Sequence, residues 1–311
     1  MEVIVSVVLT IVGLVMLCFG GNWLVNGGVN IAKKFRLSNL VIGMTIVAYG
    51  TSTPELAASV AAAGEHSAII LGNIIGSNIA NVGMVIGVSA ILVPLAVQKS
   101  VLRKEVLIML GVSFLLVLLS FDGEISQYDG ILLLGGLGVF TFYILKDVMK
   151  HREENKEKSE NGKNNIHLKS VGLIGIGIAL LYVGAILTVD NAIILAKEFG
   201  LSEKIIGLTV IAIGTSLPEL ITSIIAIRKG HTDIGIGTIV GSNIYNILMI
   251  MGIGAALGGV MIGSDVYVDY AIMIIFSLSL LIALKTGIIN RVMGVCLVIG
   301  YIAYLIVTFF K

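Results

Sequence analysis

Residues 30–55 read NIAKKFRLSNLVIGMTIVAYGTSTPE, and residues 194–219 read ILAKEFGLSEKIIGLTVIAIGTSLPE. The two stretches lie 164 residues apart and share Ala-Lys, Phe, Leu-Ser, Ile-Gly, Thr and Gly-Thr-Ser-x-Pro-Glu in register. Further along, residues 72–81 read GNIIGSNIAN and match GTIVGSNIYN at 237–246, now at an offset of 165. The chain is therefore an internal duplication, and its two halves are expected to share one fold.

The composition is that of an integral membrane protein. Of 311 residues, 57% are apolar and 13% charged, with 38 glycines and a mean hydropathy of +1.05, whereas about a quarter of the residues in soluble domains are charged. The net charge of +1 gives no basic surface for nucleic acid. Cys18 and Cys296 lie within apolar runs, so we expect no disulfide or thiol–metal framework.

Apolar runs of about 20 residues or more divide the chain into candidate transmembrane helices. The ten candidates cover about residues 3–32, 38–63, 67–95, 105–121, 128–148, 170–196, 202–227, 234–260, 267–284 and 291–310. The first run lacks a basic leader and is long for a signal peptide, so we expect it to be retained. Residues 150–169 carry charges of both signs without apolar periodicity, which is typical of a solvated linker.

This linker leaves five expected helices on each side. Residues 1–149 form the first five-helix repeat, with its duplicated core at about 38–95, and residues 170–311 form the second, with its core at about 202–260. Because each half has an odd number of helices, the second half enters the membrane from the opposite face. The predicted fold is an all-α integral membrane protein of ten helices in two inverted-topology repeats, with the second and seventh helices broken.

Lys and Arg side chains orient this fold. The loops after odd-numbered helices, with the helix ends beside them, carry 17 of these residues, and the opposite side carries 3. By the positive-inside rule, both termini lie outside a cell membrane and the linker 150–169 is cytoplasmic. Apart from the lipid bilayer, the sequence implies no nucleic acid and no obligate protein partner.

Glu55 and Glu219 lie deep within apolar runs, at equivalent positions of the two halves. An ionised carboxylate in a bilayer costs about 2.5 kcal/mol or more unless it is paired or faces water. No Lys or Arg lies deep within the helices that carry the duplicated motifs, so a bound cation is the favoured partner. A protonated structural carboxyl group is the alternative.

A proline precedes each glutamate, as Pro54 and Pro218. Because proline lacks an N–H, the carbonyl four residues earlier loses its helical donor. Irregular backbone in a bilayer is tolerated where protein or a water-filled cavity satisfies it, although a simple kink is the alternative. The backbone oxygens expected to face an ion are those of residues 48–51 and 212–215, which begin at Ala48 and Ala212.

Hydroxyl and amide side chains share helical faces with the glutamates or with each other. Thr51 and Ser52 precede Glu55 by four and three residues, and Ser77 lies four residues before Asn81. The second half repeats both patterns with Thr215, Ser216, Ser242 and Asn246. Asn78 and Asn243 point away from these hydroxyl and amide groups, and we expect them to make helix–helix contacts. For the other residues of the two patterns, helix–helix contacts are the alternative to ion binding.

These groups together favour a hard cation. Carboxylate, amide, hydroxyl and backbone oxygens are ligands for Ca²⁺, and no His or Cys lies near them to favour zinc, copper or iron. Two carboxylates balance one Ca²⁺ ion. Na⁺ also seeks oxygen ligands and has a similar size, so the same cavity suits either ion in alternation.

The motifs of both halves resemble the α-repeats of the Ca²⁺/cation antiporter superfamily, most closely the prokaryotic sodium/calcium exchangers. The resemblance rests on GTSTPEL with GSNIAN and on GTSLPEL with GSNIYN, and it extends over essentially the whole chain. It implies a core of the second, third, seventh and eighth helices, across which the first and sixth slide. It also implies that Glu55 and Glu219 ligate Ca²⁺ with backbone oxygens of Thr51 and Thr215. The implied sodium ligands are Ala48, Ser52, Ser77, Ala212, Thr215, Ser216 and Ser242.

One position departs from the pattern of this family. Many related exchangers carry an aspartate at the last position of the second GSNxxN motif, where this chain has Asn246. The expected site therefore has two formal negative charges rather than three. This difference bears on how many sodium ions move per cycle and on whether sodium or protons drive the exchange.

The sequence predicts a secondary antiporter that exchanges Ca²⁺ for Na⁺ by alternating access at a midplane site. Exchange of Ca²⁺ for H⁺, with Glu55 and Glu219 as the protonating groups, is the alternative on the same architecture. A channel is disfavoured, because inverted repeats with broken helices suit alternating access. We expect no enzyme activity, since the embedded serines have no embedded base and no nucleotide-binding motif is present. No cofactor is expected besides the transported ions.

Overall fold

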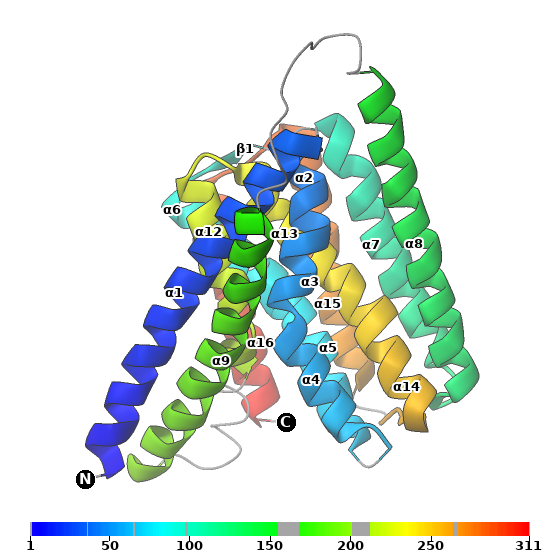
Figure 1. Cartoon of the computed structure of the whole chain (residues 1–311). Coiled ribbons are helices and arrows are strands. Elements are labelled where there is room, and N and C mark those ends of the chain that lie inside the picture. Colours follow the sequence, from blue (N-terminus) through cyan, green and yellow to red (C-terminus); the bar gives the residue numbers. More distant parts are fainter. Residues whose placement is uncertain are drawn as a thin grey trace.

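The computed structural model describes residues 2–35, 37–64, 66–96, 99–154, 168–200, 212–263 and 266–310, and these are almost entirely helical (Figure 1). Most of the predicted linker and the first half of the predicted seventh helix lie outside the described residues. The longer helices are α1 (Glu2–Phe35), α5 (Ser67–Ala80), α7 (Lys99–Leu119), α8 (Gln127–Glu154), α9 (Leu168–Glu198), α12 (Leu217–Arg228), α13 (Thr232–Tyr245), α15 (Val266–Thr286) and α16 (Arg291–Phe310). The shorter helices are α2 (Asn39–Ile42), α3 (Ala48–Thr51), α4 (Thr53–Ala62), α6 (Gly87–Leu92), α11 (Ala212–Thr215) and α14 (Gly252–Gly258).

Six helical segments are long and apolar enough to cross a membrane, among the residues that the structure describes. They are Val3–Phe35, Ser67–Leu92, Gln127–Lys146, Leu168–Glu198, Thr232–Gly258 and Arg291–Thr308. Each coincides with a predicted span, which confirms a helical membrane-protein fold. The other four predicted spans correspond to α7, to α15 and to two interrupted series, α2 to α4 and α11 to α12.

Three π-helical turns interrupt the α-helices within the described ranges: η1 (Gly43–Val47), η2 (Asn81–Ile86) and η5 (Asn246–Met251). Two of them stand at equivalent positions of the halves, each beginning at the last asparagine of a GSNxxN motif. A π turn widens the helix and is frequent at functional sites. Apolar periodicity did not predict these turns, because most residues of each turn are apolar and give no periodic signal that distinguishes a π turn from an α-helical one.

Four two-residue strands, all in the described part of the chain, depart from the all-α prediction. β1 (Leu95–Ala96) pairs antiparallel with β4 (Ile288–Ile289), and β2 (Glu124–Ile125) pairs with β3 (Val260–Met261). Each pair links one half of the chain to the other, and the two pairs occupy equivalent positions in the repeat. They satisfy backbone groups of the connections between helices, which would otherwise lack partners in a partly buried setting.

Helices α1 and α9 pack side by side as a close pair at one flank of the molecule (Figure 1). A Cβ atom added at Gly20 would lie 2.8 Å from the carbonyl oxygen of Gly177, and one at Gly177 would lie 2.9 Å from that of Gly20. Gly13 and Gly184 show the same reciprocal approach one heptad away, at 2.8 and 2.9 Å. Backbone-to-backbone contact of this kind needs glycine in both helices.

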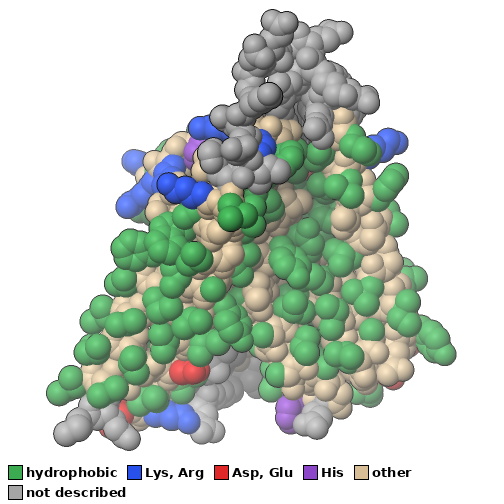
Figure 2. Space-filling model, in the orientation of Figure 1, with side chains coloured by type: hydrophobic (Ala, Val, Ile, Leu, Met, Phe, Trp, Pro, Cys, Tyr) green, Lys and Arg blue, Asp and Glu red, His purple; other side chains and the backbone are tan. Residues whose placement is uncertain are grey.

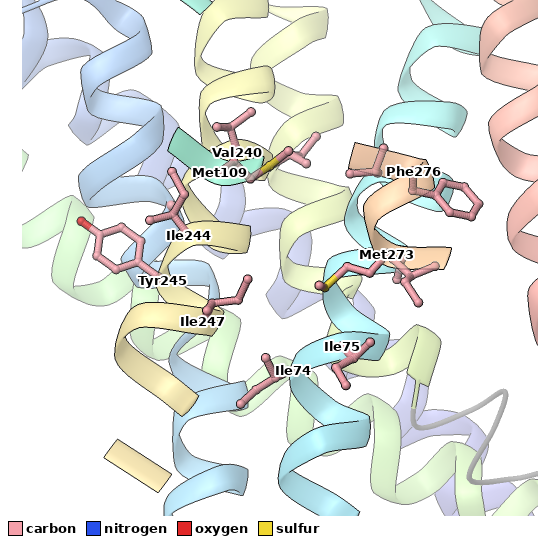
Figure 3. Packing of buried hydrophobic residues seen from close by; sticks show 14 of the residues in the cluster. Ile74, Ile75, Met109, Val240, Ile244, Tyr245, Ile247, Met273 and Phe276 are labelled. Carbon is pink, nitrogen blue, oxygen red and sulfur yellow. The ribbon is translucent and has the colours of Figure 1, made fainter. Parts of the chain in front are cut away.

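Buried apolar side chains form two separate clusters. The smaller one joins α1 and α9 to residues of α2, η1, α12 and α13, and the larger one joins other residues of these four elements to most of the remaining helices. Figure 3 shows part of the larger cluster, with Met109 of α7, Met273 of α15 and isoleucines of α5 and α13. On the outer surface, hydrophobic side chains cover the middle of the molecule and most visible Lys and Arg side chains gather at one end (Figure 2).

Candidate cation site

Both helices that carry a Pro-Glu pair are broken at a serine. Ser52 separates α3 from α4 with φ −83° and ψ 11°, and Ser216 separates α11 from α12 with φ −89° and ψ 3°. In each case the proline occupies the first turn of the helix that follows, where a missing N–H costs nothing. The glutamate sits in that same turn. The breaks expected from Pro54 and Pro218 are therefore present in the structure.

Glu219 is held by side chains of the opposite half of the chain. Ser52 Oγ lies 3.1 Å from Glu219 Oε1 and 3.0 Å from Ser242 Oγ, and Ser242 Oγ lies 3.5 Å from the same carboxylate oxygen. Thr51 also hydrogen-bonds to this carboxylate. Since Thr51 and Ser52 belong to the first repeat, the surroundings of Glu219 are assembled from both halves.

Glu55 lies close enough to Glu219 for the two carboxylates to repel each other. Both glutamates are 1% exposed. The Oε2 atom of each is buried and accepts no hydrogen bond from the described residues. An unpaired charge is costly in an apolar interior. A cation bound between these two buried carboxylates would offset their mutual repulsion and pair with their free oxygens.

An asparagine quartet, Asn78, Asn81, Asn243 and Asn246, joins the two halves. Asn78 Nδ2 donates to the Asn243 carbonyl and Asn243 Nδ2 to the Asn78 carbonyl, both at 3.3 Å. Asn81 Nδ2 donates to Asn243 Oδ1, and Asn246 Nδ2 donates to Asn78 Oδ1, both at 3.0 Å. Asn78 and Asn243 thus make the helix contacts that the sequence predicted for them.

The quartet leaves two amide oxygens unused. Asn81 Oδ1 and Asn246 Oδ1 are buried without a hydrogen-bond donor among the described residues, as is the hydroxyl of Ser216. Together with Glu55 Oε2 and Glu219 Oε2, five buried oxygens of sequence-predicted ligands have no hydrogen-bond partner within the described part of the chain. Carboxylate, amide and hydroxyl oxygens fit Ca²⁺ and Na⁺ and do not fit a metal that selects nitrogen or sulfur.

Other predicted ligands have partners within the protein. The Ala48 carbonyl accepts from the N–H of Ser52 at 3.0 Å and from Thr51 Oγ1 at 3.1 Å. Ser77 Oγ donates to the carbonyl of Asn73 in its own helix, whereas its repeat counterpart Ser242 lies beside Glu219. Thr215 is half-buried, and Ala212 is the first residue of α11.

The sequence did not single out two polar residues, Asn73 beside Glu55 and Glu105 in α7. Asn73 donates from Nδ2 to the backbone carbonyl of Glu55 at 3.0 Å and to Ser59 Oγ at 2.9 Å. Its spacing of four residues before Ser77 was a usable signal, but position 238 of the second repeat is Thr, so comparing the halves concealed it. Glu105, at the start of a predicted span, is 7% exposed and accepts from Tyr143 at 3.4 Å.

Comparison with known proteins agrees with this architecture. A family model described as sodium/calcium exchanger protein matches residues 5–146 and 169–310. The putative antiporter CaxA of Alkalimonas amylolytica is 36% identical over 97% of this chain and 98% of its own length. The sodium/calcium exchanger MaX1 of Methanosarcina acetivorans is 32% identical over 98% and 99%, and the inner membrane protein YrbG of Escherichia coli is 35% identical over 97% and 96%.

Among solved structures, the sodium–calcium exchanger NCX_Mj soaked with 10 mM Na⁺ and no Ca²⁺ superposes with a TM-score of 0.83. It is 35% identical in sequence, and the match covers 97% of this chain and 98% of that one. The helical fold and the paired motifs thus define a membrane-embedded cation antiporter. The chain belongs to the sodium/calcium exchanger family.

Proposed function

We propose that this protein exchanges Ca²⁺ for Na⁺ across a cell membrane by alternating access. The observation that carries the proposal is the pair of buried carboxylates with unpartnered oxygens, Glu55 and Glu219, in a chain of this family. Ca²⁺ neutralises both charges at once, and Na⁺ ions replace it on the return half of the cycle. The proposed ligands are Glu55, Glu219, Thr51, Thr215, Ser52, Ser216, Ser77, Ser242, Asn81, Asn246, Ala48 and Ala212.

The proposed architecture is ten transmembrane helices in two inverted five-helix repeats. The reciprocal bonds of Asn78 and Asn243 support it, because a twofold relation between the halves produces equal contacts in both directions. The equivalent strand pairs β1–β4 and β2–β3 support it in the same way. We place both termini outside and the linker in the cytoplasm, on the basis of the Lys and Arg distribution.

The moving part of this proposal is the α1–α9 pair. Its glycine contacts bring the two backbones together, so the pair is expected to move as one body. Its apolar cluster is distinct from the one that surrounds the asparagine quartet. An aliphatic interface of this kind lets one bundle slide over the other without breaking many hydrogen bonds, which is how rocking of one bundle alternates access to a fixed site.

Exchange of Ca²⁺ for protons on the same glutamates is the second candidate, and Asn246 favours it. The amide of Asn246 donates to Asn78 Oδ1 at 3.0 Å, a role that an ionised aspartate cannot take. The site therefore holds two ionisable groups rather than three. Fewer carboxylates leave less negative charge to balance sodium ions, whereas protons need only the two glutamates.

Uptake of ⁴⁵Ca²⁺ into proteoliposomes distinguishes these functions. Vesicles loaded with Na⁺ are compared with K⁺-loaded vesicles and with K⁺-loaded vesicles that carry an outward proton gradient. We expect uptake with internal Na⁺ alone. Uptake driven by protons without sodium would transfer the protein to Ca²⁺/H⁺ exchange, and no gradient-dependent uptake under any of the three conditions would overturn calcium antiport altogether.

A further inference from the structure

Asn73 links the two helices of the first half-site. It lies half-buried in α5, facing α4, which begins immediately after the break at Ser52. Its Nδ2 atom lies 3.0 Å from the backbone carbonyl of Glu55 and 2.9 Å from Ser59 Oγ, one helical turn further along α4. A carboxamide has two N–H donors, so both are used across the contact between these helices.

The backbone of Asn73 contacts a second candidate ligand. Its carbonyl accepts the hydrogen bond of Ser77 Oγ, one turn later in α5. Asn73 therefore touches two candidate ligand residues by different atoms: the main chain of Glu55 through its amide, and the side chain of Ser77 through its carbonyl. Neither contact uses the Glu55 carboxylate, which stays available for an ion.

The second repeat holds its glutamate by different contacts. Thr238 takes the place of Asn73 and donates from Oγ1 to the carbonyl of Ile234 in its own helix, at 2.8 Å. Glu219 is instead anchored at its carboxylate by Ser52 and Ser242. One glutamate is thus held by its side chain, and the other by its main chain.

We propose that Asn73 is a positioning residue for Glu55, an inference that rests on the proposed function. Glu55 lies in the first turn of α4, immediately after the break at Ser52. An unbroken helix would fix the position of Glu55 along the helix axis and its rotation about that axis, and the break removes this constraint. The amide of Asn73 supplies that constraint from the side. It fixes the main chain of Glu55, and through it the position of the carboxylate relative to Glu219, without competing for the carboxylate oxygens. Packing of α4 on α5, with no effect on ion binding, is the competing explanation.

The test is made on the purified full-length protein with two variants and one control. Asn73→Thr introduces the residue found at position 238, and Asn73→Ser replaces the carboxamide with a hydroxyl that is too short to reach the Glu55 carbonyl. Ser59→Ala is the matched control, because it removes the other partner of the same amide and leaves the bond to Glu55. The readouts are the midpoint of thermal unfolding with and without Ca²⁺, and the KM and kcat of Ca²⁺ uptake.

For both Asn73 variants we expect the Ca²⁺-induced rise in the unfolding midpoint to shrink, because a ligand stabilises the folded state according to its affinity. KM for Ca²⁺ should rise by about 2- to 10-fold, the range that the loss of one hydrogen bond produces, while kcat changes by less than about twofold. Ser59→Ala should leave the Ca²⁺-induced rise and KM unchanged.

A purely structural role would give a different pattern. The midpoint without Ca²⁺ would fall in either Asn73 variant while the Ca²⁺-induced rise and KM stayed as in the unmodified protein, and this result would overturn the inference. Should the unmodified protein itself show no Ca²⁺-induced rise and no uptake, the proposed function would fail first. The two failures are therefore distinguishable.

Discussion

Asn78 and Asn243 donate side-chain hydrogen bonds to each other's backbone carbonyl at the same distance, 3.3 Å. Each amide also lies 3.7 Å from a methionine sulfur of the opposite half, Asn78 from Met273 and Asn243 from Met109. The two methionines are themselves 164 residues apart, which extends the duplication into α7 and α15. The centre of the molecule is therefore a reciprocal polar lock between the halves, and it adjoins the proposed ligands Asn81 and Asn246.

This lock predicts strong coupling between its members. Asn243→Ala leaves the buried Nδ2 of Asn81 without its acceptor and the Asn78 carbonyl without its side-chain donor, at a cost of about 1–3 kcal/mol for each unsatisfied group. Asn78→Ala should cost a similar amount by the same logic. The side chains of Asn81 and Asn243 bond each other directly, so the double variant of Asn81→Ala with Asn243→Ala should lose less stability than the sum of the two single variants. We expect a coupling energy of about 0.5–3 kcal/mol in a double-mutant cycle of unfolding. Additive losses would contradict the bond between Asn81 and Asn243.

Removing either carboxylate should abolish transport. Glu55→Gln and Glu219→Gln each delete one of the two negative charges proposed to balance Ca²⁺, and each retains the shape of the side chain. We expect kcat/KM for Ca²⁺ uptake to fall by more than about 100-fold, since losing one partner of a buried charge interaction costs about 3–5 kcal/mol. Glu124→Gln, at an exposed glutamate in the β2 strand, is the control. This variant should fold and transport Ca²⁺ as the unmodified protein does. Near-normal uptake by both site variants would contradict the proposal that Glu55 and Glu219 bind the transported Ca²⁺.

Asn246→Asp tests the departure from the related exchangers. A carboxylate at this position faces Asn78 Oδ1, which now accepts from the Asn246 amide at 3.0 Å, so two oxygens would meet unless the new group is protonated. We expect the variant to fold and transport, with an altered dependence of Ca²⁺ uptake on internal Na⁺ and on pH. The repeat counterpart Asn81→Asp provides the comparison. An unchanged ion dependence in Asn246→Asp would mean that this position has no part in coupling.

The glycine contacts between α1 and α9 predict opposite effects for two neighbouring substitutions. A Cβ atom at Gly177 would lie 2.8 Å from the Leu24 nitrogen and 2.9 Å from the Gly20 carbonyl oxygen, whereas one at Gly175 meets nothing within 4 Å. Gly177→Ala should therefore destabilise the protein by about 1–3 kcal/mol through overpacking. Gly175→Ala should be neutral or stabilise by up to about 1 kcal/mol, because alanine favours the helix. Thermal unfolding of both variants measures the difference.

Lys229 and His231 predict a pH response at the basic end of the molecule. Lys229 Nζ hydrogen-bonds to Asn22 Oδ1 at 2.5 Å and to Asn26 Oδ1 at 2.7 Å, and so ties α1 to the end of α12. Partial burial lowers the pKa of His231 below 6.5, and the charges of Lys33 and Lys229 lower this pKa further. The unfolded state therefore binds more protons as the pH falls through 6.5, and this histidine makes the folded state less stable there.

Lys229→Met removes one of these charges. The pKa of His231 should then rise toward 6.5, and its contribution to the acid-induced loss of stability should diminish. NMR titration of the His231 ring measures the shift directly. Arg228→Met, which removes the adjacent charge, serves as the comparison and is expected to shift the titration less. Equal shifts in both variants would show that overall charge, rather than the position of Lys229, sets the pKa.

Local pattern in the sequence was enough for the helical membrane fold, for the duplication and for the two broken helices. Apolar run length reflects the thickness of the bilayer, and proline acts on its own helix, so both signals are read along the chain. The same holds for Glu55 and Glu219, because a carboxylate within an apolar run is anomalous wherever the helix finally lies. Their status as ligands stays a prediction.

The tertiary structure decided which atoms of the motifs are free. Ser77 and Ser242 are identical in motif, yet one hydroxyl is occupied by the Asn73 carbonyl and the other lies beside Glu219. The π turns at Asn81 and Asn246, the strand pairs and the anchoring of Glu55 by Asn73 also emerged only there. These features depend on contacts between separate helices, many of them about 165 residues apart in the chain. Residue type and spacing determine which groups share a helical face, whereas the partner of each group is set by the helix that packs against that face.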